Sequence, residues 1–360
     1  MRKLPPKPRI LYVTEAHSGP YPYVFAGVPD VMETMGFEVS RLDPGSANFE
    51  MYRERINKFK PDVIFCFIRY LWAARKFADF LKEYHPVVVL NWYQEDPNFT
   101  TDEYLSLSKE YDFWFTIDAN MVPFWQTKTY FMPPAFDERI YKDYGVARCY
   151  DVAYVGQLGH ELSTRMYLPY MEIMAAFGKK AMLCLERPMS LPALPGLERV
   201  LRSFKLRPYL ARLPIWKCGW TNPKDEEEKA LVMNQSKICP SLSRVWGPWE
   251  RQLRATLPEY PKDKSGYFYQ PKPRAFHAVG VGAMLLSDYY TELESLFDLG
   301  REAIVFEFGN LEEFREKLSW YTAHDQERER VAKAGFERGR KQHTFACRIR
   351  RILSIVERDS

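Results

Sequence analysis

Short, nearly continuous apolar runs alternate with helical stretches along the first 120 residues, and this rhythm constrains the fold more than any other feature. The runs are four to eight residues long, and they are RILYVTE, FEVSRLD, PDVIFCFI, VVVLNW and DFWFTID. Strands that are apolar on both faces indicate a parallel sheet covered by helices on both sides. The loop AHSGPYPYVFAG is too rich in Gly, Pro and Tyr to be helical, so we expect the first helix only in VPDVMETMG.

The rhythm pauses at 129–150, where Pro133-Pro134 and mixed charges predict a linker, and then restarts. The later strand-like runs are DVAYVGQ, KKAMLCLER, LPIWKCGW, KICPSLS, AMLLSD and AIVFEF. We expect an N-terminal domain at 1–140, a second doubly wound domain at 141–335 and a C-terminal helix at 336–360 that crosses back to the first domain. Residues 242–270 interrupt the pattern as a predicted loop–helix–loop insertion. Ligands of doubly wound sheets bind beyond the carboxyl ends of the strands, so two such halves predict a cleft between them.

Length and composition agree with two soluble domains. The chain has 360 residues, is 46% hydrophobic and 27% charged, and carries a net charge of +4, which does not call for a nucleic-acid partner. It has no run of about 18 apolar residues that would span a membrane. The N-terminus is typical of a first strand and not of a signal peptide. Six scattered cysteines without a CxxC pair favour reduced thiols and a cytoplasmic location.

The stretch PKPRAFHAVGVGAMLLSD, residues 271–288, places two cations where a helix should begin. Proline suits the first turn of a helix, but cations are disfavoured there because the helix N-terminus is already partly positive. Lys272 and Arg274 make sense if an anion such as phosphate binds between them and the free N–H groups. A surface pair of cations beside an ordinary helix is the alternative. Ser287, Asp288 and Tyr289 follow at the carboxyl end of the next strand.

The region from 271 to 350 resembles the C-terminal half of the CgeB-like glycosyltransferases. The matching pattern begins with Arg274, Phe276, Gly282, Asp288, Tyr289, Leu296, Phe297, Gly300 and Glu302, and ends with Glu312, Arg328, Gly335, His343, Thr344 and Arg348. DVAYVGQ resembles the strand that opens the second domain of the family, MPPAFDERIY its linker, and NWYQEDP its Asp-Pro loop. The family has Glu after Phe276, in a position that faces the donor, whereas this chain has His277.

The resemblance implies a GT-B fold, in which two Rossmann-like domains face each other across a cleft. It also implies a nucleotide-sugar donor, most often a UDP-sugar, on the C-terminal domain, an acceptor on the N-terminal one, and no metal or other cofactor. Cations and a helix N-terminus would neutralise the leaving diphosphate. The predicted donor-binding residues are Gly156, Gln157, Arg165, Lys272, Arg274, His277, Ser287, Asp288 and Tyr289.

The first domain is predicted to supply the acceptor side. His17 and Asp96 are the candidate catalytic bases. Ser18, Gly19 and Glu95 would lie beside them at the cleft. For each residue a structural role is the alternative; His17, for example, would then be an ordinary loop histidine.

Two other classes of protein remain open. A nucleotide-sugar epimerase shares the two-domain plan, and a non-catalytic binding or assembly protein would keep the fold with an altered site, for which His277 argues. The arginine-rich tail, with Arg338, Arg340, Lys341, Arg348, Arg350 and Arg351, could contact an acidic membrane surface or a partner. Its spacing suits a solvated helix face equally well. The acceptor could be a polysaccharide, a protein or a small molecule.

Overall fold

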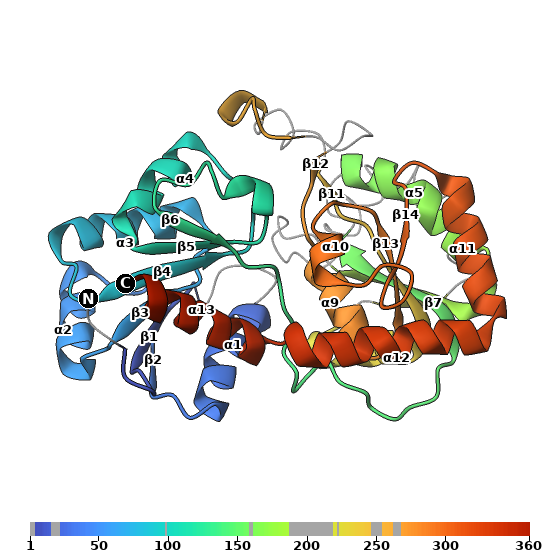
Figure 1. Ribbon diagram of the computed structural model, residues 1–360, viewed down its shortest axis with the longest axis horizontal. Helices are drawn as coiled ribbons and strands as arrows, with labels where there is room; N and C mark the ends of the chain where they lie inside the picture. Colours follow the sequence, from blue (N-terminus) through green and yellow to red (C-terminus); the bar gives the residue numbers. More distant parts are fainter. Residues whose placement is uncertain are drawn as a thin grey trace, which may run out of the picture. The chain divides into compact units, whose positions relative to one another are not determined.

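The computed structural model describes residues 4–15, 22–97, 99–157, 161–186, 219–221, 223–245, 254–261 and 268–360. The chain separates into two compact units (Figure 1). Unit 1 consists of Met1–Asp137, Pro248–Pro261 and Phe345–Ser360, and unit 2 consists of Glu138–Gly247 and Lys262–Thr344. The chain thus passes into unit 2 after residue 137, returns to unit 1 for residues 248–261, and enters unit 1 again after residue 344, whereas the sequence predicted boundaries at 140 and 335.

Unit 1 is built on a six-stranded parallel sheet with the strand order β2-β1-β3-β4-β5-β6. Its strands are β1 (Ile10–Val13), β2 (Val39–Leu42), β3 (Val63–Cys66), β4 (Val88–Tyr93), β5 (Phe113–Thr116) and β6 (Lys128–Phe131). Every residue of β1, β3 and β5 is buried, as expected for strands covered on both faces. The predicted parallel arrangement of these strands is therefore confirmed.

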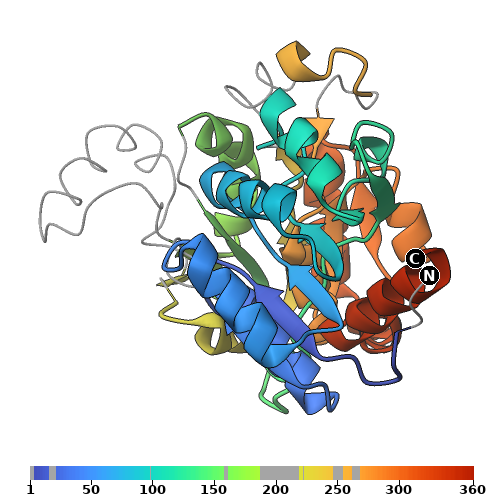
Figure 2. The same ribbon diagram turned by 90° about the vertical axis from the view of Figure 1, so that its left-hand side faces the viewer.

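The helices of unit 1 cover both faces of this sheet (Figure 2). They are α1 (Pro22–Thr34), α2 (Phe49–Phe59), α3 (Leu71–Glu83), α4 (Asp102–Leu107) and α13 (Phe345–Asp359). Because parallel crossovers are right-handed, the reversal of strand order at β1 places α1 on the face opposite to α2 and α3. Helix α13 packs beside α1 and contributes Phe345, Ile349 and Ile352 to the core of unit 1.

Two sequence expectations for unit 1 were wrong. Helix α1 begins at Pro22, inside the segment predicted to be a loop, because proline at a first helical position loses no intrahelical hydrogen bond. Strand β6 lies at the edge of the sheet within the expected linker. Its residues are only partly buried, so it lacks the apolar run that marks the central strands.

Unit 2 repeats the plan with the strand order β14-β13-β10-β7-β8-β9, again parallel throughout. Its strands are β7 (Tyr150–Gln157), β8 (Ala181–Glu186), β9 (Gly219–Thr221), β10 (Ser236–Ser241), β13 (Met284–Asp288) and β14 (Ile304–Phe306). A separate antiparallel pair joins β11 (Arg244–Val245) to β12 (Phe268–Tyr269).

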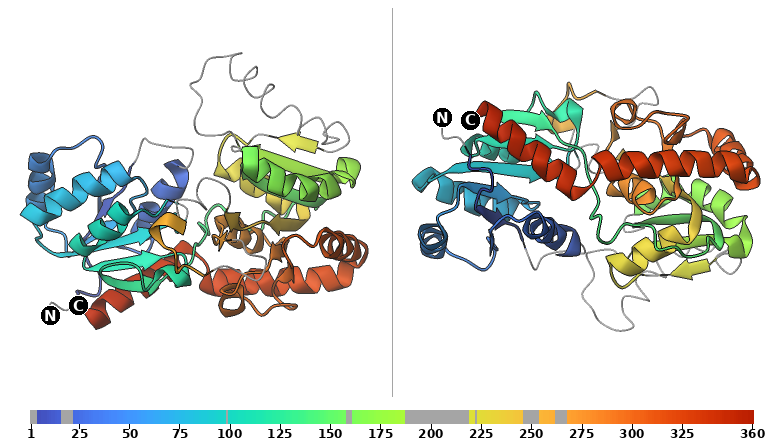
Figure 3. Two further views of the ribbon diagram at one scale, coloured as in Figure 1. Left: turned by 90° about the horizontal axis from the view of Figure 1, so that it is seen from above. Right: turned by 60° about the horizontal axis from the view of Figure 1, so that its bottom comes forward.

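Helices also cover both faces of the second sheet (Figure 3). They are α5 (Glu161–Ala175), α7 (Glu226–Asn234), α9 (Pro273–Gly280), α10 (Leu293–Leu296), α11 (Leu311–Ala323) and α12 (Asp325–Gln342). Helices α5 and α11 pack together, whereas α9 contacts both α7 and α12. Among the described residues, no helix has the length and apolar character needed to cross a membrane.

The register of the second sheet brings three strand ends together. Ser241 at the end of β10 lies opposite Ser287 near the end of β13, and β7 is the neighbour of β10 on its other side. Helix α9 leads into β13 through Gly282, whose positive φ of 73° favours glycine. The segments after β7, β10 and β13 therefore meet at one edge of the sheet, where a doubly wound unit binds its ligand.

Candidate functional site

Arg274 lies beside the carboxyl end of β7. It is the second residue of α9, and its guanidinium donates a hydrogen bond to the hydroxyl oxygen of Tyr154 while lying 4.9 Å from the centroid of that ring. Tyr154 and Gly156 project from the same face of β7 because side chains alternate along a strand. A Cβ atom at position 156 would stand only 2.8 Å from Nη1 of Arg274, so the missing side chain of Gly156 makes room for the guanidinium.

The start of α9 adds further positive character to the same place. Lys272 is the N-cap residue and makes no side-chain capping bond, and Pro273 is the first helical residue. The Nζ atom of Lys272 donates to the side-chain oxygen of Gln270. Lys272 and Arg274 each donate a hydrogen bond to a neutral oxygen atom. Together with the helix N-terminus, this arrangement suits an anionic ligand.

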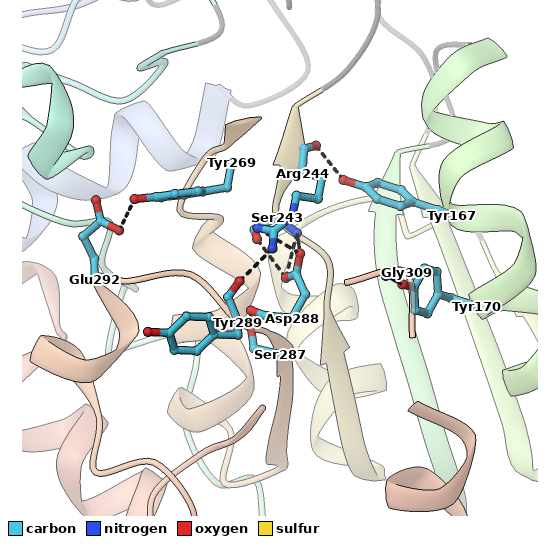
Figure 4. A network of polar contacts seen from close by, with 10 residues as sticks. All are labelled: Tyr167, Tyr170, Ser243, Arg244, Tyr269, Ser287, Asp288, Tyr289, Glu292 and Gly309. Carbon is cyan, nitrogen blue, oxygen red and sulfur yellow. Dashed lines mark hydrogen bonds and ion pairs between the residues drawn. The ribbon is translucent and has the colours of Figure 1, made fainter. Parts of the chain in front are cut away.

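Asp288 is fully buried and anchors a polar network rather than presenting a free carboxylate (Figure 4). Its two oxygens accept hydrogen bonds from the backbone N–H of Ser243 at 3.0 and 3.1 Å, and Oδ1 also accepts from the Ser243 hydroxyl at 2.8 Å. Burial raises the pKa of the Asp288 carboxyl, against the opposing effects of Arg244 and Ser243. These bonds tie the end of β13 to the segment that follows β10.

Arg244 completes this network. Its Nη2 donates to the carbonyl oxygen of Tyr289 at 2.8 Å, and its Nη1 lies 3.7 Å from Oδ2 of Asp288. The Arg244 carbonyl in turn accepts from the hydroxyl of Tyr167 on α5 at 2.8 Å (Figure 4). Ser287, also buried, donates to the carbonyl oxygen of Asp288. The geometry favours a role in fixing the strand-end backbone for Ser287 and Asp288, while their predicted contact with a donor stays a prediction.

The remaining predicted donor residues are placed differently. The Tyr289 hydroxyl donates to Glu294 at 2.7 Å on the exposed side of its loop. His277 is buried in the last turn of α9, with its ring stacked on Tyr141. Gln157 ends β7 and Arg165 lies in α5, but the side chains of both fall outside the part of the chain that the structure describes.

In unit 1, Asp96 follows β4 and is fully buried. Its carboxylate accepts hydrogen bonds from Thr100 at 2.6 Å, from Thr116, and from Nε1 of Trp125 at 3.1 Å. Burial raises the pKa of Asp96 to about 7, although these three bonds act in the opposite direction. A pKa near neutrality suits a general base, but donors of its own unit already occupy both carboxylate oxygens.

Glu95 is held by an ion pair, in which its Oε1 lies 2.7 Å from Nε of Arg69. The residues predicted beside it, His17, Ser18 and Gly19, lie outside the described residues. Within the described ranges no group of three or more His, Cys, Asp or Glu side chains could hold a metal ion. Metal-independent chemistry remains a prediction.

Sequence reasoning missed the residues that hold these groups in place. Tyr154 could have been found, because it precedes Gly156 by two positions in the same strand and so shares its face. Ser243 and Arg244 lie in a segment interpreted as an insertion, and their contacts with Asp288 and Tyr289 span 45 residues of sequence. No local sequence pattern predicts a contact between residues so far apart in the chain.

Two parallel, helix-covered sheets in one chain, each Rossmann-like, define the class of fold as GT-B, and the comparisons with known proteins agree. A family model described as "Glycosyl transferase-like" matches residues 196–354. Comparison with curated protein sequences gave no match. The resemblance to the CgeB-like family in particular stays a prediction.

Solved structures match nearly the whole chain at low sequence identity. Sucrose-phosphate synthase from Thermosynechococcus elongatus is 10% identical, with 97% of this chain and 98% of that chain covered and a TM-score of 0.66. A glycosyltransferase from Rickettsia africae is also 10% identical, with 98% of each chain covered and a TM-score of 0.65. HepE of Anabaena, in complex with UDP and glucose, is 11% identical, with coverages of 97% and 99% and a TM-score of 0.64. These likenesses establish the GT-B fold.

Proposed function

We propose that this chain is a glycosyltransferase that takes a sugar from a nucleotide-diphosphate donor, of the UDP-sugar class, and transfers it to an acceptor hydroxyl or amine. The observation that carries the proposal is the guanidinium of Arg274 against Gly156 at the carboxyl end of β7. The glycosyl transferase-like family match includes the whole of α9 and β13, and the HepE structure contains UDP and glucose. Both support a donor site in unit 2.

The chemistry assigned to this site is stabilisation of the leaving group. When the bond between the anomeric carbon and the diphosphate oxygen breaks, its electron pair stays on the diphosphate, whose negative charge increases. Arg274, Lys272 and the N-terminus of α9 are positioned to stabilise that charge, which removes the need for a divalent cation. The acceptor oxygen or nitrogen forms the new bond and gives up its proton. Asp96 in unit 1 is the proposed recipient of that proton, with the pKa that the task requires.

The test is a thermal-unfolding screen against UDP-, GDP-, ADP- and CMP-sugars with the wild-type protein and the Arg274→Ala variant. Arg301→Ala is the matched control, because Arg301 is a 68% exposed arginine of the same unit. A ligand at 100 times its Kd stabilises the folded state by about 2.7 kcal/mol, which corresponds to a Tm increase of roughly 5–10 °C for a unit of this size. We expect this shift for one nucleotide family in wild type and Arg301→Ala, and its loss in Arg274→Ala.

The release of free nucleotide from the bound donor then separates an enzyme from a binding protein. Slow donor hydrolysis without acceptor, lost in Arg274→Ala, would support transferase chemistry. Binding without any release, even with acceptor mixtures, would favour the non-catalytic alternative. The absence of a Tm shift with every nucleotide sugar at millimolar concentration would refute the donor site.

A further inference from the structure

A buried polar cluster surrounds His277, which follows Arg274 by three residues in α9. It consists of Tyr141 from the segment before β7, Glu226 and Lys229 from α7, and His277 from α9, and we call it the His277 cluster. None of the four residues is more than 5% exposed. Buried charges need close partners because their desolvation is costly, so such a cluster has to be well organised.

The contacts within the cluster are complementary. Nζ of Lys229 lies 2.8 Å from Oε1 of Glu226, and the Tyr141 hydroxyl donates to Oε2 of the same carboxylate. The rings of Tyr141 and His277 are stacked, with centroids 3.8 Å apart and planes inclined by 15°. Tyr141 therefore joins the buried ion pair of α7 to the imidazole of α9.

His277 itself carries an unused polar atom. Its Nδ1 is buried and has no hydrogen-bond partner among the described residues, although a buried polar atom left without a partner is destabilising. Burial, followed by the charges of Lys229 and Arg274, lowers the pKa of His277 well below its ordinary value. The imidazole is thus neutral at physiological pH. His277 lies three residues after Arg274 in α9, so the two side chains are neighbours on the surface of the helix.

We propose that Tyr141 is a positioning residue of the donor site, and that it acts through His277. Its ring fixes the imidazole so that a ring nitrogen is available to the ligand held by Arg274, while burial, assisted by the charge of Lys229, keeps the imidazole uncharged. This inference rests on the proposed function, since it assumes a nucleotide sugar at α9. A neutral imidazole offers a hydrogen bond rather than a third positive charge, so His277 selects an uncharged hydroxyl of the donor and not its diphosphate.

The test measures the Kd of UDP-glucose by calorimetry between pH 5.5 and 8, a range in which this ligand does not titrate. Tyr141→Leu removes the stacked ring, and Tyr141→Phe keeps the ring but removes the bond to Glu226. Tyr170→Leu is the matched control, because Tyr170 is a buried tyrosine of α5 with its own aromatic neighbours in the same unit. Ring NMR of His277, assigned with His277→Gln, reports its protonation in each variant.

We expect Tyr141→Leu to raise the Kd about tenfold, with Tyr141→Phe within about threefold of wild type and Tyr170→Leu unchanged in Kd despite its lower Tm. Lys229→Met removes a cation that lowers the pKa of His277, so this pKa should rise in the variant. The affinity of this variant should therefore increase towards acid pH, whereas the affinity of wild type stays constant.

Equal Kd values for wild type and folded Tyr141→Leu would overturn the positioning role while leaving the donor site intact. A pH-independent Kd for Lys229→Met, with His277 still neutral at pH 5.5, would overturn the role of the ion pair. If wild type binds no nucleotide sugar, the proposed function fails, and the inference about Tyr141 fails with it.

Discussion

A methyl group at position 156 gives the sharpest test of the donor site. In Gly156→Ala the new Cβ would lie 2.8 Å from both Nη1 of Arg274 and the hydroxyl oxygen of Tyr154, closer than such atoms can approach, and 3.0 Å from Nη2 of Arg274. The backbone of Gly156 does not have a positive φ, so alanine adds no conformational strain there. Of the two equally near obstacles, the end of the long arginine side chain can move away, whereas the ring of Tyr154 is fully buried. We therefore expect a small loss of stability, about 1 kcal/mol, together with a displaced guanidinium.

The expected effect on binding follows from what the displaced guanidinium would have contributed. A hydrogen bond to a charged group contributes about 1.5–3 kcal/mol, so its loss should raise the Kd of UDP-glucose roughly 10- to 100-fold. Isothermal titration calorimetry gives the Kd of wild type, Gly156→Ala, Arg274→Ala and the double variant, which together form a double-mutant cycle. Because the guanidinium is the more mobile of the two obstacles, the alanine should act mainly by displacing it and should cost little further affinity once Arg274 is gone.

Additive effects of the two substitutions on the binding free energy would refute this reasoning. If Gly156→Ala weakened binding as much in the Arg274→Ala background as in wild type, the methyl group would act on the ligand directly or through Tyr154, and not through the guanidinium. An unchanged Kd for Gly156→Ala in the wild-type background would show that the position of the guanidinium does not matter for binding.

Three further substitutions test the packing around the sites. Because burial raises the pKa of Asp96 to about 7, ionisation of this carboxyl opposes folding. The free energy of unfolding should therefore fall by up to about 4 kcal/mol as pH rises from 4 to 7. Asp96→Asn resembles the protonated acid and should reduce this pH dependence, as measured by urea unfolding. Gly335→Ala would place a Cβ 2.5 Å from the carbonyl oxygen of Glu302 and should lower the unfolding free energy by about 1–3 kcal/mol, seen as a lower Tm. Ser243→Ala removes the 2.8 Å hydroxyl bond to buried Asp288 and should cost about 1–3 kcal/mol in the same assay; an unchanged Tm would mean that water replaces the hydroxyl.

The fold could be predicted from the sequence where burial leaves a local pattern. Central strands such as β3 and β5 are buried on both faces, so their residues are apolar without interruption. Edge strand β6 is only partly buried, and nothing in its four residues separates it from a linker. The start of α1 was missed because proline signals a turn as readily as a first helical turn.

The candidate site was predictable only in part, for a different reason. Arg274 stood out because a cation at a helix start conflicts with the helix dipole, and a local conflict of this kind is visible in the sequence. Lys229 gave no such signal, because a lysine that follows three glutamates is typical of a solvated helix. Its burial depends on the packing of α7 against α9, in which His277 lies 48 residues further along the chain, and this packing is decided by the tertiary structure alone.

The charged residues at the strand ends of unit 1 and unit 2 differ in their surroundings, and this difference supports different roles for the carboxylates and the cations. Asp96 and Asp288 are both fully buried and accept hydrogen bonds from their own units, so these carboxylates serve first to hold neighbouring groups in place. Lys272 and Arg274 bring two cations to the start of α9, and a diphosphate requires positive charge. For Asp96 to accept a proton from an acceptor, one of its three donors must first give way to the acceptor. Replacement of Asp96 should therefore change the pH dependence of stability and the rate of transfer while leaving donor affinity constant, whereas changes at Arg274 should act on donor affinity directly.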